Sequence, residues 1–416
     1  MDKVGELPDR FLTDEQRMMR ETCRRYVDRV VKPFIAANRE REWFVDPAER
    51  TPPEILEEAD AAGLRTLGVP AEYGGVDLDP ATEAQTFAII ATELSRGDTG
   101  LTIKLAQGWK ISIILRELAP KHLQDEWFGR FMADPHLLMA HCLTEQRGAS
   151  DRWLPYNVPE AAMETKAVHE DGHWRINGRK QFISNGYDAT LYVVYANTDP
   201  SVGMLDGTSS FLVPRDTPGL EVTRCNETLG GRYENNGEIT FTDCRVPDDH
   251  LLAEGRALTL ARNYFRPGKI TVAAGALGVG IAAFEDTARF VQERVVGGRL
   301  LIKHQAVAGR LADMATKLEA VSALLRRAAV AVDNDDPDTN TLCFMVKVFS
   351  ANSIVDVCHQ AVELHGGYGA MMEVGIEKYY RDALLYLHTD STTDIANFKI
   401  VKDLFPQTAG AYAGPE

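Results

Sequence analysis

The segment Y-Y-R-D-A-L-L-Y-L-H-T-D-S-T-T-D-I, residues 379–395, brings an arginine, a histidine and three carboxylates into one short stretch. A carboxylate held against a bound substrate can serve as a general base when its surroundings tune its basicity. Asp390 lies between the histidine and a run of hydroxyl-bearing residues. We therefore take Asp390 as the candidate for proton transfer.

The spacing of the histidines and cysteines predicts neither a metal site nor a disulfide framework. The ten histidines and six cysteines are dispersed, without an H-E-x-x-H motif or a C-x-x-C pair, so no metal site is predicted. Cys225 and Cys244 could approach each other in a sheet, but free buried thiols are the favoured interpretation. Reduced cysteines of this kind are typical of a cytosolic protein.

Composition indicates a globular, acidic enzyme. The 416 residues are 44% hydrophobic and 25% charged, enough for two or three domains. Lys and Arg total 45 against 61 Asp and Glu, a net charge of -16 that disfavours nucleic acid and anionic membranes as partners. The N-terminus has no basic region followed by an apolar run, and nowhere do eighteen apolar residues follow one another. We expect a cytoplasmic chain without membrane spans.

The elements that must position Asp390 fall into three regions. Residues 1–137 have helical periodicity, and Thr13 with Gln16 forms a capping box at its start. Residues 138–256 contain short runs rich in β-branched and aromatic residues, which predict antiparallel strands. Asp171-Gly172 and Asn177-Gly178 separate such runs as hairpin turns do. Residues 257–416 return to the helical period, and the segments 259–297, 302–332, 338–365 and 393–405 predict a four-helix bundle.

Six motifs in order along the chain resemble those of the acyl-CoA dehydrogenase family. They are P-A-E-Y-G-G, L-T-E-Q-R-G-A-S-D, Q-F-I-S-N-G, R-V-V-G-G-R-L-L-I-K-H-Q, H-G-G-Y-G and Y-R-D-A. One such motif alone is weak, but six at the right spacing are specific. The resemblance implies an α+β multidomain fold: an N-terminal helical domain, a middle antiparallel β-barrel-like domain and a C-terminal four-helix bundle.

The resemblance further implies FAD as cofactor and a coenzyme A thioester as substrate. A base removes the proton α to the carbonyl, while flavin N5 accepts the β-hydride. Electrons then leave to an electron-transferring flavoprotein, and the enzymes are usually homotetramers. Phe182 replaces the family's usual tryptophan, which keeps a flat wall but loses an N–H donor.

Cofactor and substrate residues are carried over from the matching motifs. Those expected at the flavin ring are His141, Cys142, Leu143, Thr144, Ser150, Phe182, Ile183 and Ser184, and Thr392 and Thr393 are expected to touch FAD. Those expected at the adenosine and pyrophosphate, typically across a subunit interface, are Arg294, Gln305, Gly366 and Gly367. Ser150, Lys269 and Asp98 are expected at the substrate, although capping of the next helix is the stronger interpretation of Asp98.

Asp390 is where this chain departs from the family. Counted from Y-R-D-A, it occupies the position of the catalytic glutamate, and Gly268 stands where some relatives place an alternative glutamate. Aspartate is one methylene shorter, and a misplacement near 1 Å costs on the order of a hundredfold in rate. The shorter base therefore favours a short, branched or alicyclic acyl group, such as cyclohexane- or cyclohexene-carboxyl-CoA.

Other activities on the same fold stay open at this stage. They are a flavin oxidase or hydroxylase, a dehydrogenase of a carrier-protein-bound acyl group, and an inactive flavin-binding homologue. An oxidase resembling nitroalkane oxidase also uses an aspartate, but that subgroup has an arginine where this chain has Asn397. A docking surface for a carrier protein would be basic.

Overall fold

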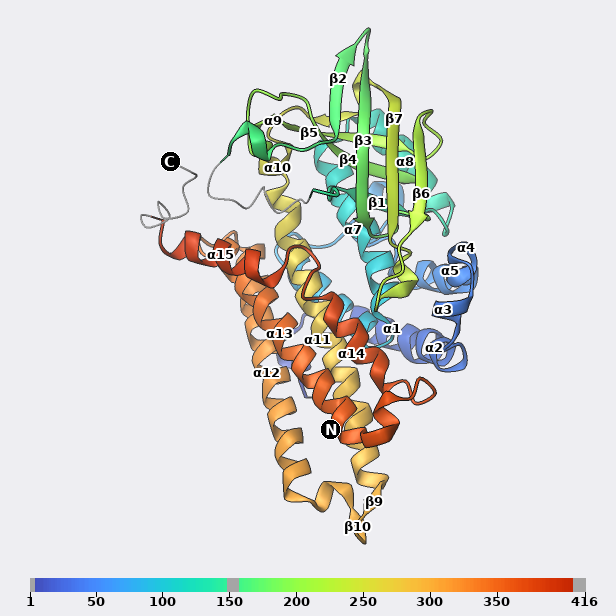
Figure 1. Ribbon diagram of the computed structural model, residues 1–416, viewed down its shortest axis with the longest axis vertical. Helices are drawn as coiled ribbons and strands as arrows, with labels where there is room; N and C mark the ends of the chain where they lie inside the picture. Colours follow the sequence, from blue (N-terminus) through green and yellow to red (C-terminus); the bar gives the residue numbers. More distant parts are fainter. Residues whose placement is uncertain (1–3, 148–156, 407–416) are drawn as a thin grey trace.

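A computed structural model describes residues 4–147 and 157–406 of the chain. Its β-sheet lies at one end of the molecule and the long C-terminal helices extend to the other, as Figure 1 shows. The N-terminal helices pack beside the junction between the two. Because three separate regions of the sequence meet at this junction, it is where a site assembled from all of them would form.

The N-terminal region is helical, in agreement with its periodicity. Its first helix begins with the expected capping box, in which Thr13 Oγ1 accepts from the backbone N–H of Gln16 at 3.1 Å. The last three helices form most of its buried core. The helices are α1 (Asp14–Tyr26), α2 (Lys32–Ala37), α3 (Arg41–Phe44), α4 (Pro47–Arg50), α5 (Pro53–Ala61), α6 (Glu83–Ser95), α7 (Thr99–Leu118) and α8 (Lys121–Ala133).

The middle region forms one sheet whose strands run in the order β6-β7-β3-β2-β4-β5-β8, with β1 paired to β4. Most pairs are antiparallel, as expected, but β1 runs parallel to β4. The strands are β1 (Met139–Cys142), β2 (Lys166–Glu170), β3 (His173–Ile183), β4 (Leu191–Asn197), β5 (Thr208–Pro214), β6 (Leu220–Cys225), β7 (Gly237–Pro247) and β8 (Leu251–Ala253). A short helix, α9 (Met204–Gly207), precedes β5.

One of the two predicted hairpin turns is confirmed and the other is wrong. Asp171-Gly172 joins β2 to β3, where Glu170 pairs directly with His173. Asn177-Gly178 instead lies inside β3, at a register shift against β7. A Cβ at Gly178 would stand 2.6 Å from Thr165 Cα, so this glycine allows the backbone of a neighbouring segment to approach closely.

The C-terminal region contains the predicted long helices and one further helix. Helix α11 (Arg262–Glu293) packs against α12 (Gln305–Asp333), α13 (Thr339–His365) and α6. The additional α14 (Ile376–Leu385) packs on α11 and α13, and α15 (Thr393–Leu404) packs on α13. The short α10 (Ala257–Leu260) precedes α11, and the two-residue strands β9 (Val295–Val296) and β10 (Arg299–Leu300) form a hairpin before α12.

Two segments, Arg266–Glu293 and Thr339–Ala370, are long and apolar enough to cross a membrane by length and composition. Their most apolar windows are 83% and 56% buried within the molecule. Burial against neighbouring helices accounts for this composition, because a helix that is apolar on all sides is characteristic of a packed core as well as of a membrane span.

Candidate active site

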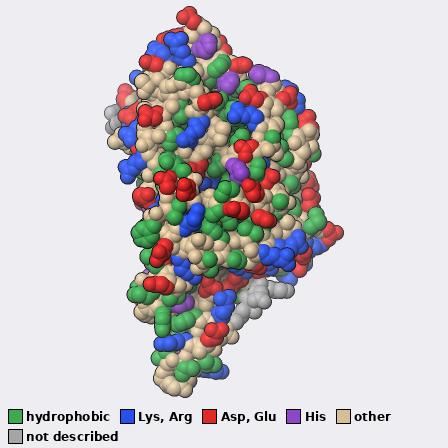
Figure 2. Space-filling view, turned by 90° about the vertical axis from the view of Figure 1, so that its right-hand side faces the viewer, with side chains coloured by type: hydrophobic (Ala, Val, Ile, Leu, Met, Phe, Trp, Pro, Cys, Tyr) green, Lys and Arg blue, Asp and Glu red, His purple; other side chains and the backbone are tan. Residues whose placement is uncertain are grey.

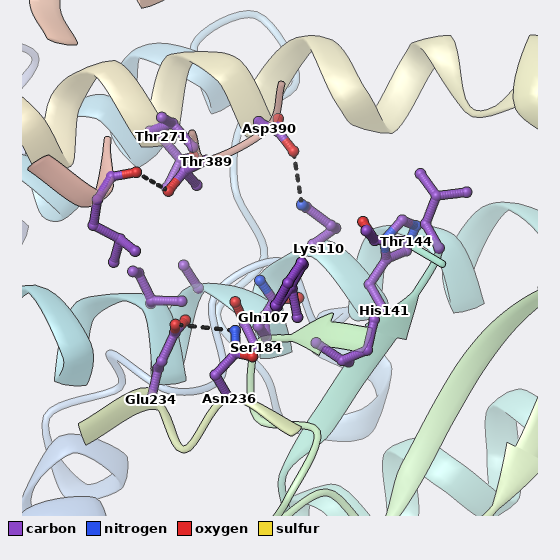
Figure 3. A pocket seen from close by; sticks show the side chains of 18 of the residues that line it. Gln107, Lys110, His141, Thr144, Ser184, Glu234, Asn236, Thr271, Thr389 and Asp390 are labelled. Atoms are coloured by element: carbon purple, nitrogen blue, oxygen red, sulfur yellow. Dashed lines mark hydrogen bonds and ion pairs between the residues drawn. The ribbon is translucent and has the colours of Figure 1, made fainter. Parts of the chain in front are cut away.

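A cavity of about 670 Å³ lies at the junction of the three regions. Helices α6, α7 and α11, strands β1 and β3, and the loop between α14 and α15 all contribute to its lining. Figure 3 shows Asp390 on one wall, with Ser184 and Glu234 on the opposite wall. Sequence reasoning predicted that Asp390 and Ser184 would face the same site, and the fold brings both to this cavity.

Asp390 is held in a sharply turned loop. Helix α14 ends at Leu385, and the N–H groups of His388 and Thr389 then donate to its carbonyl at 3.0 and 3.1 Å. Asp390 and Ser391 both have positive φ, 58° and 108°. Such conformations cost about 1–3 kcal/mol each for residues with a side chain, and they concentrate at functional sites. The strained turn directs the Asp390 side chain into the cavity.

Lys110 of α7 brings a cation close to this carboxylate. Its Nζ lies 3.8 Å from Asp390 Oδ1, and the two side chains are only 15% and 13% exposed. A Cβ added to Gly268 would stand 3.4 Å from Asp390 Oδ2 and 3.5 Å from Lys110 Cε. The absence of a side chain at position 268 therefore leaves room for both. An adjacent ammonium favours the ionised form of a carboxylate, which is the form a general base requires.

Lys347 of α13 forms a hydrogen bond with the same loop. Its Nζ donates to the carbonyl of Leu387 at 3.1 Å. Burial lowers the pKa of Lys347 to about 8; the negative charge of Asp390 acts in the opposite direction, and Lys269 adds to the lowering. The loop that carries the candidate base is thus fixed to the bundle by a buried lysine.

Most of the residues predicted at the flavin line the cavity. His141, Leu143, Thr144, Phe182, Ile183, Ser184 and Thr392 line the cavity. Cys142 is fully buried on the other side of β1, and Thr393 is not among the lining residues either. Phe182 is 61% exposed although it is a large aromatic residue, and its φ is 57°. A flat ring system placed in the cavity would cover such a side chain.

Two residues predicted to contact the substrate do not reach the cavity. Asp98 caps α7, where its carboxylate accepts from the N–H of Leu101 at 2.8 Å, and it forms an ion pair with Lys378 at 2.8 Å. Lys269 is 3% exposed, and its Nζ lies 4.7 Å from the centre of the Phe344 ring. The polar ends of both side chains are engaged inside the protein, so neither side chain is placed at the cavity. The helix cap that the sequence favoured for Asp98 is confirmed.

The remaining predicted residues lie elsewhere. Ser150 is outside the described residues. Arg294, Gln305, Gly366 and Gly367 are exposed, and none of them lines the cavity. Arg294 directly precedes the β9–β10 hairpin, which Figure 1 shows at the end of the bundle far from the sheet. The Arg294 guanidinium lies 5.4 Å from the centre of the Tyr368 ring. The motif that begins at Arg294 and the H-G-G-Y-G motif therefore contact each other.

Glu234 and Lys110 are cavity residues that sequence reasoning missed. Glu234 follows a glycine pair in G-G-R-Y-E-N-N, a stretch without periodicity that gives no functional signal. Lys110 could have been found, because it and Lys104 are the only lysines in the strongly apolar sequence of α7. A charge on the buried side of an apolar helix requires a partner, and Asp188 and Asp390 are those partners.

Comparison with known proteins identifies the family of the chain. The families described as acyl-CoA dehydrogenase N-terminal, middle and C-terminal domain match residues 13–133, 140–244 and 255–404. The chain belongs to the acyl-CoA dehydrogenase family. As an acyl-CoA dehydrogenase it is an FAD-dependent oxidoreductase acting on a CoA thioester.

The similarity to known relatives spans nearly the full length of this chain and of each relative. The mitochondrial short-chain specific acyl-CoA dehydrogenase of Rattus norvegicus is 31% identical over 94% of this chain and 90% of the relative. Cyclohex-1-ene-1-carbonyl-CoA dehydrogenase of Geobacter metallireducens is 32% identical over 95% and 100%. The structure of butyryl-CoA dehydrogenase from Megasphaera elsdenii has 25% identity and a TM-score of 0.83, covering 94% and 98%.

The residues present fit an isoalloxazine ring in the cavity. Thr144 and Ser184 offer hydroxyl groups, Phe182 offers an uncovered aromatic face, and Glu234 offers a buried carboxyl oxygen without a well-aligned partner. A flavin site requires hydrogen bonds to the ring edge and an apolar wall. The cavity lining of this acyl-CoA dehydrogenase supplies both.

Proposed function

We propose that this enzyme removes hydrogen from the α and β carbons of a short, branched or alicyclic acyl-CoA and yields the enoyl-CoA. The observation that carries the proposal is the placement of Asp390 on the cavity wall, opposite the residues expected at the flavin. FAD, when bound, supplies the acceptor for the β-hydride. Asp390 takes the α-proton, and the backbone of its loop is the expected source of an N–H for the thioester carbonyl.

The surroundings of Asp390 suit this role. Lys110 favours the carboxylate over the acid before the substrate arrives, because the two charges lie 3.8 Å apart in a partly desolvated setting. Trp109, Ile113 and Phe87 line the same cavity and exclude water from it. A desolvated carboxylate is a stronger base toward a carbon acid than one in bulk water.

The aspartate side chain supports a compact acyl group. With one methylene less than glutamate, the base reaches less far into the cavity, so the α-carbon must lie closer to the loop. Gly268 leaves space at this position, because no side chain separates α11 from the carboxylate. A ring or branch next to the thioester carbonyl would occupy the part of the cavity that a longer base would fill. The similarity to a cyclohex-1-ene-1-carbonyl-CoA dehydrogenase points in the same direction.

We further propose an electron-transferring flavoprotein as electron acceptor, a homotetrameric assembly and a cytoplasmic location. The family membership and the acidic composition support these proposals. Figure 2 also shows acidic side chains interspersed among the basic ones on one face of the molecule.

The test is anaerobic bleaching of the flavin by butyryl-CoA, a branched thioester and cyclohexanecarboxyl-CoA, with Asp390→Asn alongside. We expect the variant to bleach at least about a thousandfold more slowly, because the amide cannot accept the proton. Bleaching at the parent rate would refute the assignment of the base. Rapid reoxidation of the reduced enzyme by oxygen, in place of transfer to the flavoprotein acceptor, would identify an oxidase instead.

Asp390→Glu gives the complementary measurement. The longer carboxylate should favour the straight-chain butyryl-CoA relative to the alicyclic thioester, because it occupies part of the space left beside Gly268. A change in the preference by about tenfold is expected. An unchanged preference would mean that the length of the base does not select the acyl group.

A further inference from the structure

Glu234 is a buried acid of the cavity to which the proposed chemistry gives no role. It lines the cavity and is 2% exposed. In Figure 3 its side chain lies beside Asn236 and Ser184, across the cavity from Asp390. Asn236 Nδ2 donates to Glu234 Oε1 at 3.3 Å. The second oxygen, Oε2, is buried and has no well-aligned hydrogen bond.

The carboxyl group is held rigidly. Glu234 ends a single turn, Arg232–Glu234, that lies between two residues in the left-handed conformation, Gly231 and Asn235. The backbone N–H of Asn185 donates to the Glu234 carbonyl at 3.0 Å, and Arg50 holds the turn through the carbonyl of Arg232 at 3.1 Å. Oε2 therefore occupies a fixed position, which is the arrangement expected of a binding group and not of a solvated side chain.

The environment of Glu234 favours its uncharged form. Burial raises the pKa of Glu234, while Ser184, Asn236 and the charge of Lys104 only partly offset the effect. Lys104 is itself paired with Asp188 at 2.6 Å, so it is not available as a dedicated counter-ion. Glu145, at another part of the same cavity, shows the contrast: burial alone would raise its pKa, but Lys180 at 2.7 Å lowers it. A carboxyl group without such a partner keeps its proton.

We propose that Glu234 is a further binding residue of this site, whose protonated carboxyl group donates a hydrogen bond to an acceptor atom of the molecule bound against Ser184. The acceptor is a carbonyl-type oxygen or a ring nitrogen. It can belong to the flavin ring or to the acyl thioester, which share this chemistry. The inference rests on the proposed function only in that both ligands occupy the cavity.

The experiment measures binding against pH. The dissociation constants of FAD and of butyryl-CoA are determined from pH 6 to pH 9 for the enzyme and for Glu234→Gln, with butyryl-CoA titrated in the Asp390→Asn background so that turnover does not intervene. Gln keeps an N–H donor at every pH, whereas Glu loses its donor when it ionises. We expect the affinity of the parent for one ligand to fall by about tenfold as pH rises, and that of Glu234→Gln to stay constant.

The ligand that shows this difference identifies the acceptor. A change confined to FAD assigns the flavin ring, and a change confined to butyryl-CoA assigns the acyl thioester. Identical pH dependence of the parent and Glu234→Gln for both ligands would overturn the proposal. Because neither measurement requires turnover, a failure here is distinct from a failure of Asp390 as the base.

Two further variants complete the test. Glu238→Gln is the matched control, since Glu238 is buried nearby, pairs with Arg179 and does not line the cavity. It should keep the pH dependence of the parent. Glu234→Leu has no donor and should bind the same ligand weakly at every pH. It decides the question if Glu234→Gln does not fold, and tight binding by Glu234→Leu would also overturn the proposal.

Discussion

Asp390 and Lys110 come from segments almost three hundred residues apart, yet their charged atoms meet at 3.8 Å on the cavity wall. The pair has a functional consequence because only the ionised carboxylate can accept the α-proton. An ammonium at this distance stabilises that form, and both side chains are sufficiently buried for solvent to screen the effect only in part. Loss of the cation should therefore change the pH at which Asp390 becomes ionised and able to accept the proton. It should not abolish that ability.

Lys110→Met should displace the acid limb of the kcat/KM profile toward higher pH by about one unit, since the carboxylate loses its neighbouring cation. The measurement is the rate of anaerobic flavin reduction by butyryl-CoA between pH 5 and pH 9. Lys121→Met, which removes a largely exposed cation on α8, serves as the control and should leave the profile in place. A profile for Lys110→Met that coincides with the parent would show that the ion pair does not tune the base.

At the residue scale, the sequence predicted what local motifs determine. Asp390, Ser184 and Thr144 keep a fixed distance from recognisable motifs, and the fold brings all three to one cavity. Asp98 could not be placed in the same way, because whether a carboxylate faces a substrate or caps a helix depends on partners distant in sequence, here Lys378. Glu234 was missed for the same reason: its burial results from packing against α7 and β3.

A buried lysine of α13 holds the loop between α14 and α15. Lys347 donates to the carbonyl of Leu387, and burial lowers its pKa to about 8. In the unfolded chain a lysine keeps its proton up to a pH near 10.4. Between these values the unfolded state binds more protons than the folded state, so the free energy of unfolding rises with pH.

The stability difference between the parent and Lys347→Met should accordingly increase with pH in favour of the parent. Its slope is expected to approach about 1.4 kcal/mol per pH unit between pH 8 and pH 10. Urea denaturation of the FAD-loaded enzyme at several pH values gives the measurement. Lys166→Met on β2 is the control, since that lysine is exposed. A difference that stays flat across this range would contradict the lowered pKa of Lys347 in the folded protein.

A local sequence signal predicted the structure correctly only where no long-range strand pairing competed with it. The capping box of Thr13 and Gln16 is complete within one turn, and it forms as predicted. Asn177-Gly178 carries an equally strong local turn signal, but β3 continues through it because β2 and β7 pair with the strand on both sides. The ladder hydrogen bonds of an established sheet outweigh the preference of two residues for a turn.

At the scale of the whole molecule, the predicted cofactor residues form two separate groups. His141, Thr144 and Ser184 line the cavity, whereas Arg294 and Gln305 lie exposed at the far end of the bundle. The family resemblance implies that such residues hold FAD across a subunit interface. We therefore propose that two copies of the chain, related by a symmetry axis, each bring the bundle end to the cavity of the other. The sequence predicted both groups but could not show that they are separated within one chain.

Co-expression of Asp390→Asn with Arg294→Ala tests this shared site. Each variant alone should be nearly inactive, the first for lack of a base and the second because FAD phosphate loses its arginine. If the sites are shared, a mixed pair contains one site with both Asp390 and Arg294 intact, and random mixing restores about one quarter of the parental sites. Activity and bound FAD are measured on the co-purified mixture. If both groups served one chain, every chain in the mixture would carry a defective site, and no activity would return.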